Sequence, residues 1–248
     1  MKNLTVSEKI YFYLVGFLAI LSSVGILLPQ GEFIPQKNLP ASLWALALMS
    51  AVIIVVFYGT LGWYGLRFSK KIGFANIWDS SVKSKQRFLI PLITGICLGA
   101  FFIVIDFVFS GFNKYGPMPH PPFPLSIVAS ATAGIGEELM FRLFFVSFWV
   151  WLVSFVVLKN RFQDEVFWVV SAVSAALFSV AHFPALMYLY GLKSMAEIPT
   201  LVMVEVFILN GAISVFAAYY FRKYGFLAAI GLHFWADIIW HGLGGLFR

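Results

Sequence analysis

The chain is poor in charge and has almost no cysteine. Only 11% of its 248 residues are Asp, Glu, Lys or Arg, against about 25% in soluble domains. Its one cysteine, Cys97, excludes an intrachain disulfide and a cysteine-based zinc site. The net charge of +6 is not arranged as a basic stripe with interleaved aromatic residues, so nucleic acid is not an expected partner.

Long apolar runs are what the sequence has in abundance, with 61% of its residues hydrophobic. About 20 apolar residues in a helix cross a ~30 Å hydrocarbon layer. Seven runs of this kind occur, at roughly 10–29, 42–66, 88–110, 124–158, 166–190, 199–221 and 225–247. The sequence therefore predicts an all-α, polytopic transmembrane helix bundle of about seven to eight spans.

The fourth run is unusually long and leaves two alternatives open. Its 35 residues would make a helix of ~52 Å at ~1.5 Å per residue. It either projects past the bilayer or contains a break near Gly134 and Gly136. No internal repeat, low-complexity tract or linker divides the chain, so residues 1–248 are expected to form a single membrane-embedded domain.

Basic residues between the spans predict the orientation. Cytoplasmic loops carry an excess of Lys and Arg, and a cytoplasmic N-terminus puts twelve basic residues inside and four outside. The inner set is Lys2, Lys9, Arg67, Lys70, Lys71, Lys83, Lys85, Arg87, Lys159, Arg161, Arg222 and Lys223. The outer set is Lys37, Lys114, Lys193 and Arg248. The sequence predicts an integral, multi-pass membrane protein with its N-terminus in the cytoplasm.

Two adjacent carboxylates and an arginine interrupt the fourth run. Charged side chains inside a membrane are costly and mark functional sites or buried ion pairs. Glu138 and Arg142 are four residues apart and share a helix face, which predicts an internal salt bridge. Glu137 points about 100° away from Glu138. It is either a general base facing a cavity or a protonated carboxyl that ties two helices together.

The fifth and seventh apolar runs carry histidines and other polar residues. His182 precedes Phe183-Pro184, and Pro184 is expected to weaken its helix locally. His233 and Asp237 are four residues apart and share a face, as do Asp237 and His241. They form either a local pair that fixes the last helix or part of a site shared with Glu137. Packing or interfacial roles are expected for three other intramembrane polar residues, Asp106, Glu205 and Asn210.

The order of these groups resembles a known family. Glu-Glu-x-x-Phe-Arg, then Phe-x-x-x-His, then His-x-x-x-Asp, each on its own span, is similar to the CPBP proteins, the CAAX prenyl endopeptidases and the bacteriocin-processing or immunity proteins of the Abi type. The similar region covers about 126–240, and the N-terminal 120 residues match by hydropathy alone. The resemblance implies an intramembrane endopeptidase that hydrolyses a membrane-associated peptide or protein of CAAX, leader-peptide or bacteriocin type.

The resemblance also implies a role for each residue. Glu137 and His182 would activate water, His233 and Asp237 would stabilise the oxyanion, and Glu138 with Arg142 would support them. Asp237 stands where the prenyl endopeptidases have Asn, and an ionised Asp cannot donate a hydrogen bond to an oxyanion.

Three alternatives stay open at the level of sequence. Glu137, His182 and His233 would be the ligands if the site held zinc, although a reaction without a cofactor is expected because no His-Glu-x-x-His occurs. Intramembrane Glu, Asp and His also serve proton-coupled transporters, although transporters usually show repeated halves. A non-catalytic immunity or scaffold protein is the third alternative. The expected partners are membrane lipid and a peptide or protein substrate, prenylated or not.

Overall fold

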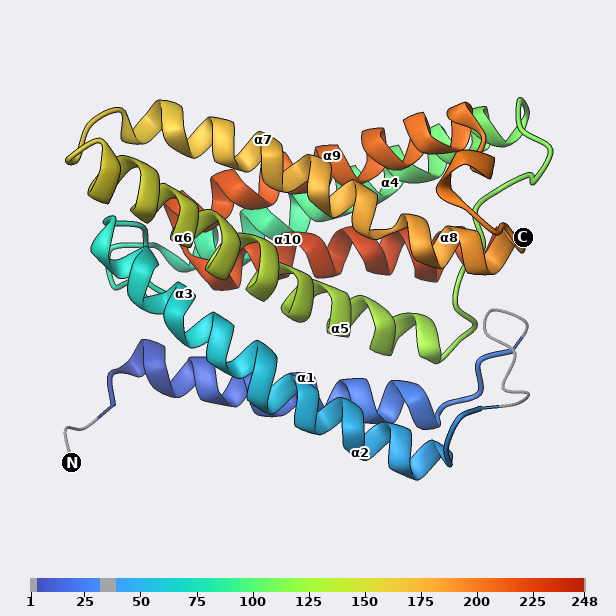
Figure 1. Ribbon diagram of the computed structural model, residues 1–248, viewed down its shortest axis with the longest axis horizontal. Helices are drawn as coiled ribbons and strands as arrows, with labels where there is room; N and C mark the ends of the chain where they lie inside the picture. The colour runs from blue at the N-terminus through green and yellow to red at the C-terminus, as the bar shows by residue number, and fades with distance from the viewer. Residues whose placement is uncertain (1–3, 32–38, 248) are drawn as a thin grey trace.

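The computed structural model describes residues 4–31 and 39–247. All of the regular secondary structure in these residues is helical (Figure 1). Seven of its helices are long and apolar enough to cross a membrane. They are Val6–Leu27, Leu43–Lys71, Lys85–Ser110, Leu125–Val157, Gln163–Tyr190, Thr200–Tyr224 and Phe226–Leu246. The predicted all-α bundle is confirmed, and the described residues contain seven candidate spans, the lower of the two expected numbers.

The first three spans lie between Val6 and Ser110. They consist of α1 (Val6–Leu27), then α2 (Leu43–Ile53), η1 (Ile54–Tyr58) and α3 (Gly59–Lys71), then η2 (Lys85–Leu89) and α4 (Ile90–Ser110), where η1 and η2 are π-helical. Thr5 and Glu8 begin α1 with a capping box: the Thr5 amide donates to Glu8 Oε2 at 2.7 Å, and the Glu8 amide donates to Thr5 Oγ1 at 3.3 Å.

The fourth span is one continuous 33-residue helix. It runs through α5 (Leu125–Glu138), the π-helical η3 (Leu139–Val146), α6 (Ser147–Val150) and the π-helical η4 (Trp151–Val157). The break considered near Gly134 and Gly136 is wrong, because both glycines lie inside α5. The departure from α-helix comes after Glu138 and takes the form of a wider π-helical turn, a feature often found at functional sites.

The last three spans are α7 (Gln163–Ala181) with α8 (Phe183–Tyr190), then α9 (Thr200–Tyr224) after the short η5 (Met195–Glu197), then α10 (Phe226–Asp237) with η6 (Ile238–Leu243) and η7 (Gly244–Phe247). His182 separates α7 from α8, and Pro184 stands in the first turn of α8. Proline cannot donate to the preceding turn, so the predicted local weakening at Pro184 is confirmed.

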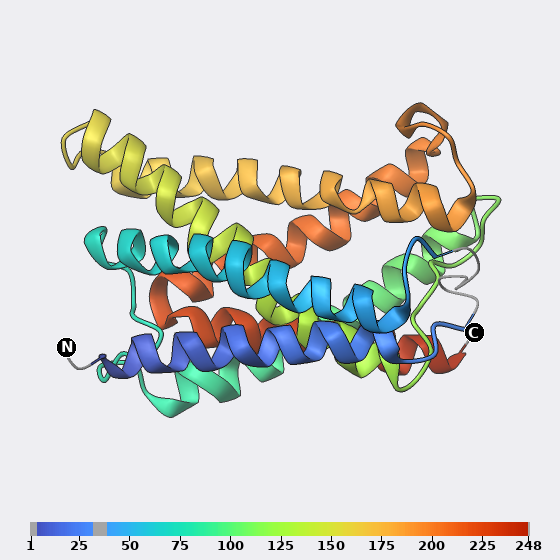
Figure 2. The same cartoon turned by 60° about the horizontal axis from the view of Figure 1, so that its bottom comes forward.

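Helix α10 lies in the interior and contacts α4, α5 and α9 (Figures 1 and 2). Glycines make these approaches close. A Cβ at Gly95 would lie 2.5 Å from the Leu232 carbonyl oxygen, and one at Gly99 would lie 2.5 Å from that of Ala236. A Cβ at Gly134 on α5 would lie 3.2 Å from the amide nitrogen of Phe234. Small residues thus bring α4 and α5 against the two turns of α10 that carry His233 and Asp237.

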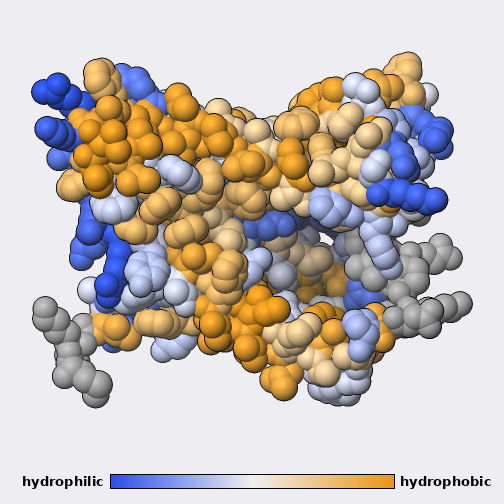
Figure 3. Space-filling model, viewed as in Figure 1, coloured by the Kyte–Doolittle hydropathy of each residue, from blue (hydrophilic) through white to orange (hydrophobic). Residues whose placement is uncertain are grey.

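Successive connections between the spans lie at alternate ends of the bundle. The N-terminal end of α1, the 72–84 connection and the 158–162 connection lie at one end, and the C-terminus lies at the other (Figure 1). The broad face between the ends is mainly hydrophobic (Figure 3). Three residues of the charge count, Lys2, Lys37 and Arg248, lie outside the described residues.

Candidate active site

A buried ion pair joins two turns of the fourth span. Glu138 and Arg142 are 0% and 1% exposed, and Glu138 Oε2 lies 3.4 Å from Arg142 Nε. Arg142 Nη2 also donates to Ser214 Oγ on α9 at 2.7 Å, and its guanidinium lies 4.9 Å from the centre of the Phe178 ring on α7. The predicted salt bridge is present, and it links three spans as well as closing one helical turn.

His233 on α10 is surrounded by carboxyl groups from two helices. Its Nδ1 lies 2.7 Å from Glu138 Oε1. Its Nε2 lies 3.6 Å from Glu137 Oε2 and 3.5 Å from Asp237 Oδ2. Glu138 can only accept when ionised, so Nδ1 carries the hydrogen of this bond. The bond fixes the ring so that Nε2 is directed toward Glu137 and Asp237.

Glu137 lies at the boundary between this buried cluster and an open cavity. Its side chain is 34% exposed, whereas that of Glu138 is fully buried. One carboxyl oxygen faces His233, and the residue also lines a cavity of about 710 Å³. The expectation that Glu137 and Glu138 point in different directions is therefore met, and Glu137 is the carboxylate that can meet a substrate and water together.

The cavity beside Glu137 is enclosed by α1, by α2 with η1, and by α5. Its described lining is mostly apolar and includes Leu18, Ile54 and Gly136. Glu137 is the one charged side chain in that lining. The space-filling view shows hydrophilic residues inside a hollow near the middle of the otherwise hydrophobic face (Figure 3). A mostly apolar lining with one carboxyl group suits a ligand that is itself partly apolar.

His182 lies next to this cluster but is not joined to it directly. Its Nδ1 lies 2.8 Å from the Phe178 carbonyl oxygen, so Nδ1 carries the hydrogen and Nε2 is left as an acceptor in the neutral ring. The Phe178 ring contacts both imidazoles, with centroids 4.8 Å from His182 and 6.0 Å from His233. Among the described residues, no hydrogen bond or ion pair connects His182 with Glu137.

Helical periodicity places His241 on a face shared with Asp237 but gives no indication of a role for His120. His120 Nδ1, in the 111–124 connection, lies 2.9 Å from His241 Nδ1 on η6. Burial lowers the pKa of His120 to about 4, because a charged ring would lose its hydration. The contact spans 121 residues and could not be found from helical periodicity.

Three other polar residues lie in the spanning helices, outside the candidate site. Asp106 Oδ1 accepts from the Met118 amide at 2.9 Å, which holds the 111–124 connection to α4. Asn210 Nδ2 donates to the Val206 carbonyl of its own helix at 3.0 Å. Glu205 is 1% exposed on α9. None of the three touches Glu137 or His233 through a described contact, in keeping with the expected packing roles.

The alternative zinc ligands are not gathered in this arrangement. Among the residues that the structure describes, no group of three or more His, Cys, Asp or Glu side chains is placed to hold a metal ion. Glu137 and His233 face each other, but His182 is turned toward its own helix.

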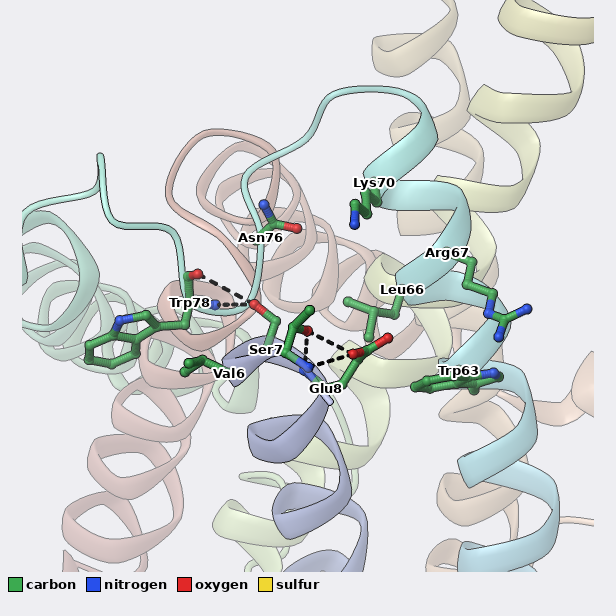
Figure 4. Close-up of a pocket in the computed structure, with 10 residues that line it drawn as sticks. Val6, Ser7, Glu8, Trp63, Leu66, Arg67, Lys70, Asn76 and Trp78 are labelled. Atoms are coloured by element: carbon green, nitrogen blue, oxygen red, sulfur yellow. Dashed lines mark hydrogen bonds between the residues drawn. The ribbon is translucent and has the colours of Figure 1, made fainter. Parts of the chain in front are cut away.

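A second pocket lies at the N-terminal end of α1, away from these carboxylates. It measures about 230 Å³ and is lined by Glu8, Arg67 and Lys70 together with Trp63 and Trp78 (Figure 4). The contacts drawn there are the capping box of α1 and the bond between the Ser7 hydroxyl and the Trp78 backbone. They fix the start of the first span to the 72–84 connection, and the pocket shares no residue with the candidate site.

Comparison with known proteins matches the part of the chain that holds the candidate site. Residues 119–239 match the family model described as type II CAAX prenyl endopeptidase Rce1-like. No curated protein and no solved structure matches the chain. The matched segment contains Glu137, Glu138, Arg142, His182 and both members of the His233–Asp237 pair, and it confirms the resemblance read from the motifs. The chain is an integral, multi-pass membrane protein whose residues 119–239 are similar to the Rce1-like CAAX prenyl endopeptidases.

Proposed function

We propose that this protein is an intramembrane endopeptidase in which Glu137 activates the attacking water. One observation carries the proposal: Glu137 borders the 710 Å³ cavity on one side and lies 3.6 Å from His233 Nε2 on the other. A general base must reach both water and the substrate carbonyl, and an oxyanion donor must lie close to the same carbonyl. Glu137 and His233 satisfy these two requirements together.

The reaction follows from these positions. Glu137 takes a proton from water, and the hydroxide attacks the carbonyl carbon of the scissile peptide bond. His233 donates from Nε2 to the resulting oxyanion when both ring nitrogens carry protons. The Glu137 carboxyl then gives its proton to the amide nitrogen, the C–N bond breaks, and the products are a carboxylic acid and an amine.

The buried groups hold this arrangement in place. Glu138 fixes His233 through the 2.7 Å bond to Nδ1, and Arg142 neutralises Glu138. Asp237, 3.5 Å from Nε2, orients the ring and balances the charge of an imidazolium. Second contacts of this kind keep a catalytic ring within the small range of positions that the chemistry tolerates.

His182 is proposed to assist Glu137 through a water molecule. Its Nε2 is free to accept a hydrogen, because Nδ1 is used on the Phe178 carbonyl. The position at the junction of α7 and α8 exposes part of the ring. An acceptor there can hold the second hydrogen of the attacking water while Glu137 removes the first.

The lining of the cavity supports a lipid-modified or strongly apolar substrate, of which a prenylated CAAX peptide is the family example. Burial of apolar surface contributes roughly 25 cal/mol per Å², so loss of a prenyl chain should raise KM more than it lowers kcat. Purified protein in lipid, given the same peptide with and without the chain, tests this. Equal KM for both peptides would contradict a lipid-binding role for the cavity.

The principal test is cleavage by Glu137→Gln. The substitution keeps the size of the side chain and removes the base, so cleavage should fall by at least ~10²-fold while thermal stability is unchanged. Glu205→Gln is the matched control, because Glu205 is also a carboxyl group in a spanning helix but is buried outside the site. Full activity of Glu137→Gln would refute the proposed mechanism.

Three further variants separate the roles. His233→Ala should cost ~10²–10³-fold if the ring is an oxyanion donor. His182→Ala should resemble Glu137→Gln, and the double variant should be little worse than either, because groups that act on one water are not additive. An excess of chelator should leave the wild-type rate unchanged. Loss with chelator and recovery with zinc would keep the site but replace the chemistry by metal catalysis.

A further inference from the structure

The oxyanion in the proposed reaction has few donors available. Among the described side chains around His233 Nε2, Glu137 and Asp237 are carboxylates, which accept but do not donate when ionised. Removing one donor from an oxyanion site typically costs ~10²–10³-fold in rate. A peptidase that lacks an amide at position 237 therefore needs another donor on the substrate's side of Glu137.

Tyr58 lies where such a donor is needed. It is the last residue of the π-helical η1 in the second span, and it lines the same cavity as Glu137. Its ring packs over Gly136, the residue before Glu137, with Cε1 3.8 Å from the position that a Cβ would take there.

The Tyr58 hydroxyl is also free to bind a ligand. No hydrogen bond involving it occurs within the described part of the chain. Two other tyrosines of the bundle use theirs: the Tyr11 hydroxyl donates to the Gly59 carbonyl, and the Tyr220 hydroxyl lies 2.7 Å from Thr94 Oγ1. The Tyr58 ring is held by packing against the core cluster of Leu18 and Ile135, so its hydroxyl is positioned without being occupied.

We infer that Tyr58 is a catalytic residue whose hydroxyl donates a hydrogen bond to the carbonyl oxygen of the scissile bond as the Glu137-activated water attacks. The inference rests on the proposed peptidase function. No proton is transferred, because the phenol keeps its hydrogen throughout and only the strength of the bond increases as the oxygen becomes negative. In this chain the second span thereby supplies the donor that Asp237 does not.

The test is Tyr58→Phe, which keeps the ring on Gly136 and removes only the hydroxyl. We expect kcat to fall ~10–10²-fold with KM nearly unchanged, because the bond gains its strength in the transition state. Tyr220→Phe is the control for loss of a phenol elsewhere in the bundle, and it should retain the wild-type kcat. The melting temperature in detergent should be the same for Tyr58→Phe and the wild type.

A second measurement does not depend on turnover. A peptide phosphonate, whose tetrahedral anionic oxygen imitates the oxyanion, should bind Tyr58→Phe more weakly by the factor lost from kcat/KM. Unchanged kcat and unchanged phosphonate affinity would overturn the inference. So would a rise in KM alone, or a shift of the pH profile with the plateau rate kept, since the hydroxyl would then act on substrate binding or on Glu137 only.

The same experiments separate this inference from the proposed function. If the wild type cleaves, Glu137→Gln does not, and Tyr58→Phe equals the wild type, the role of Tyr58 is wrong and the peptidase function stands. If Glu137→Gln cleaves as well as the wild type, or if the wild type cleaves neither the prenylated nor the unmodified peptide, both proposals fall.

Discussion

The first three spans and the last four differ in how much of themselves they bury. In the most hydrophobic windows of the first three, 22%, 17% and 28% of residues are buried, against 33%, 39%, 44% and 44% in the last four. The family match begins at residue 119 and so covers only the last four spans. The first two spans therefore act mainly as a wall facing lipid, whereas α4 packs on α9 and α10 and forms the core together with the C-terminal spans, which carry the candidate site residues.

The two regions are also held together by different forces. Lipid removes the hydrophobic drive that joins helices in water, so spans associate through close packing and polar contacts. The core has both, in its Glu138–Arg142–Ser214 contacts and in the glycine approaches of α4 and α5 to α10. The wall has fewer polar contacts, of which the bonds of Tyr11 and of Ser23 to backbone carbonyls are examples. Substitutions in the core should cost more than equivalent substitutions in the wall.

The largest expected contrast is in labelling across the membrane, where the result is all or none. Ser81 and Ser194 are exposed residues of connections at opposite ends of the bundle, one from each region. In a Cys97→Ser background, Ser194→Cys should react with an impermeant thiol reagent in intact cells and Ser81→Cys should not, because basic loops stay cytoplasmic. The reverse pattern would invert the predicted orientation of both regions.

Loss of the core ion pair should have the largest effect on stability. Arg142→Ala leaves Glu138 buried and unpaired, which should cost ~3–5 kcal/mol. Asp164→Asn breaks the ion pair with Arg222, whose side chains are 76% and 30% exposed, and should cost roughly 0–1 kcal/mol. Thermal unfolding in detergent measures both. Similar melting temperatures for the two variants would show that Arg142 does not hold Glu138.

Equivalent glycine substitutions in the two regions should have opposite signs. A methyl group at Gly95 meets the α10 backbone at 2.5 Å, so Gly95→Ala should destabilise the fold by ~1–3 kcal/mol. Gly16 on α1 has nothing within 4 Å of the same position, so Gly16→Ala should stabilise its helix by roughly 0.5–1 kcal/mol. Destabilisation by both would mean that α1 is packed as tightly as the core.

The smallest expected effect is on the pH dependence of stability. The pKa of His120 is about 4 in the fold, below its ordinary 6.5. The unfolded chain therefore binds a proton more readily, and the contribution of His120 is complete above pH 6.5 and is lost as the pH falls toward 4. The melting temperature of the wild type should fall more steeply over this range than that of His120→Gln. Parallel curves would show that His120 is solvated in the folded state.

Features set by one helix could be predicted from the sequence, and contacts between distant helices could not. Helical periodicity predicted the Glu138–Arg142 salt bridge, whose closest atoms are 3.4 Å apart. It also predicted the shared face of His233 and Asp237, whose side chains approach to 3.5 Å. The same periodicity could not show that His233 binds Glu138, 95 residues away. Nor could it show that Gly95 on α4 packs against the backbone of α10.

The position of His182 is a second example of an arrangement that the sequence does not predict. Its motif placed it with Glu137, yet the fold bonds it to its own helix and puts Phe178 between it and His233. The position of His182 depends on where α7 ends, and helix ends are set by packing as well as by the proline that follows. The roles of His182, Glu137 and the other site residues stay predictions for the cleavage assays.

The wall beside the cavity has a kinetic consequence. Met49 and Ile53 on α2 line the cavity, yet they are 55% and 46% exposed on a helix that meets lipid. A substrate anchored in the bilayer reaches such an entrance by lateral diffusion, so its effective concentration is its mole fraction in the lipid and not its amount per volume of buffer. Extra inert lipid, at constant enzyme and substrate, should therefore slow the reaction by surface dilution, as extra buffer would not.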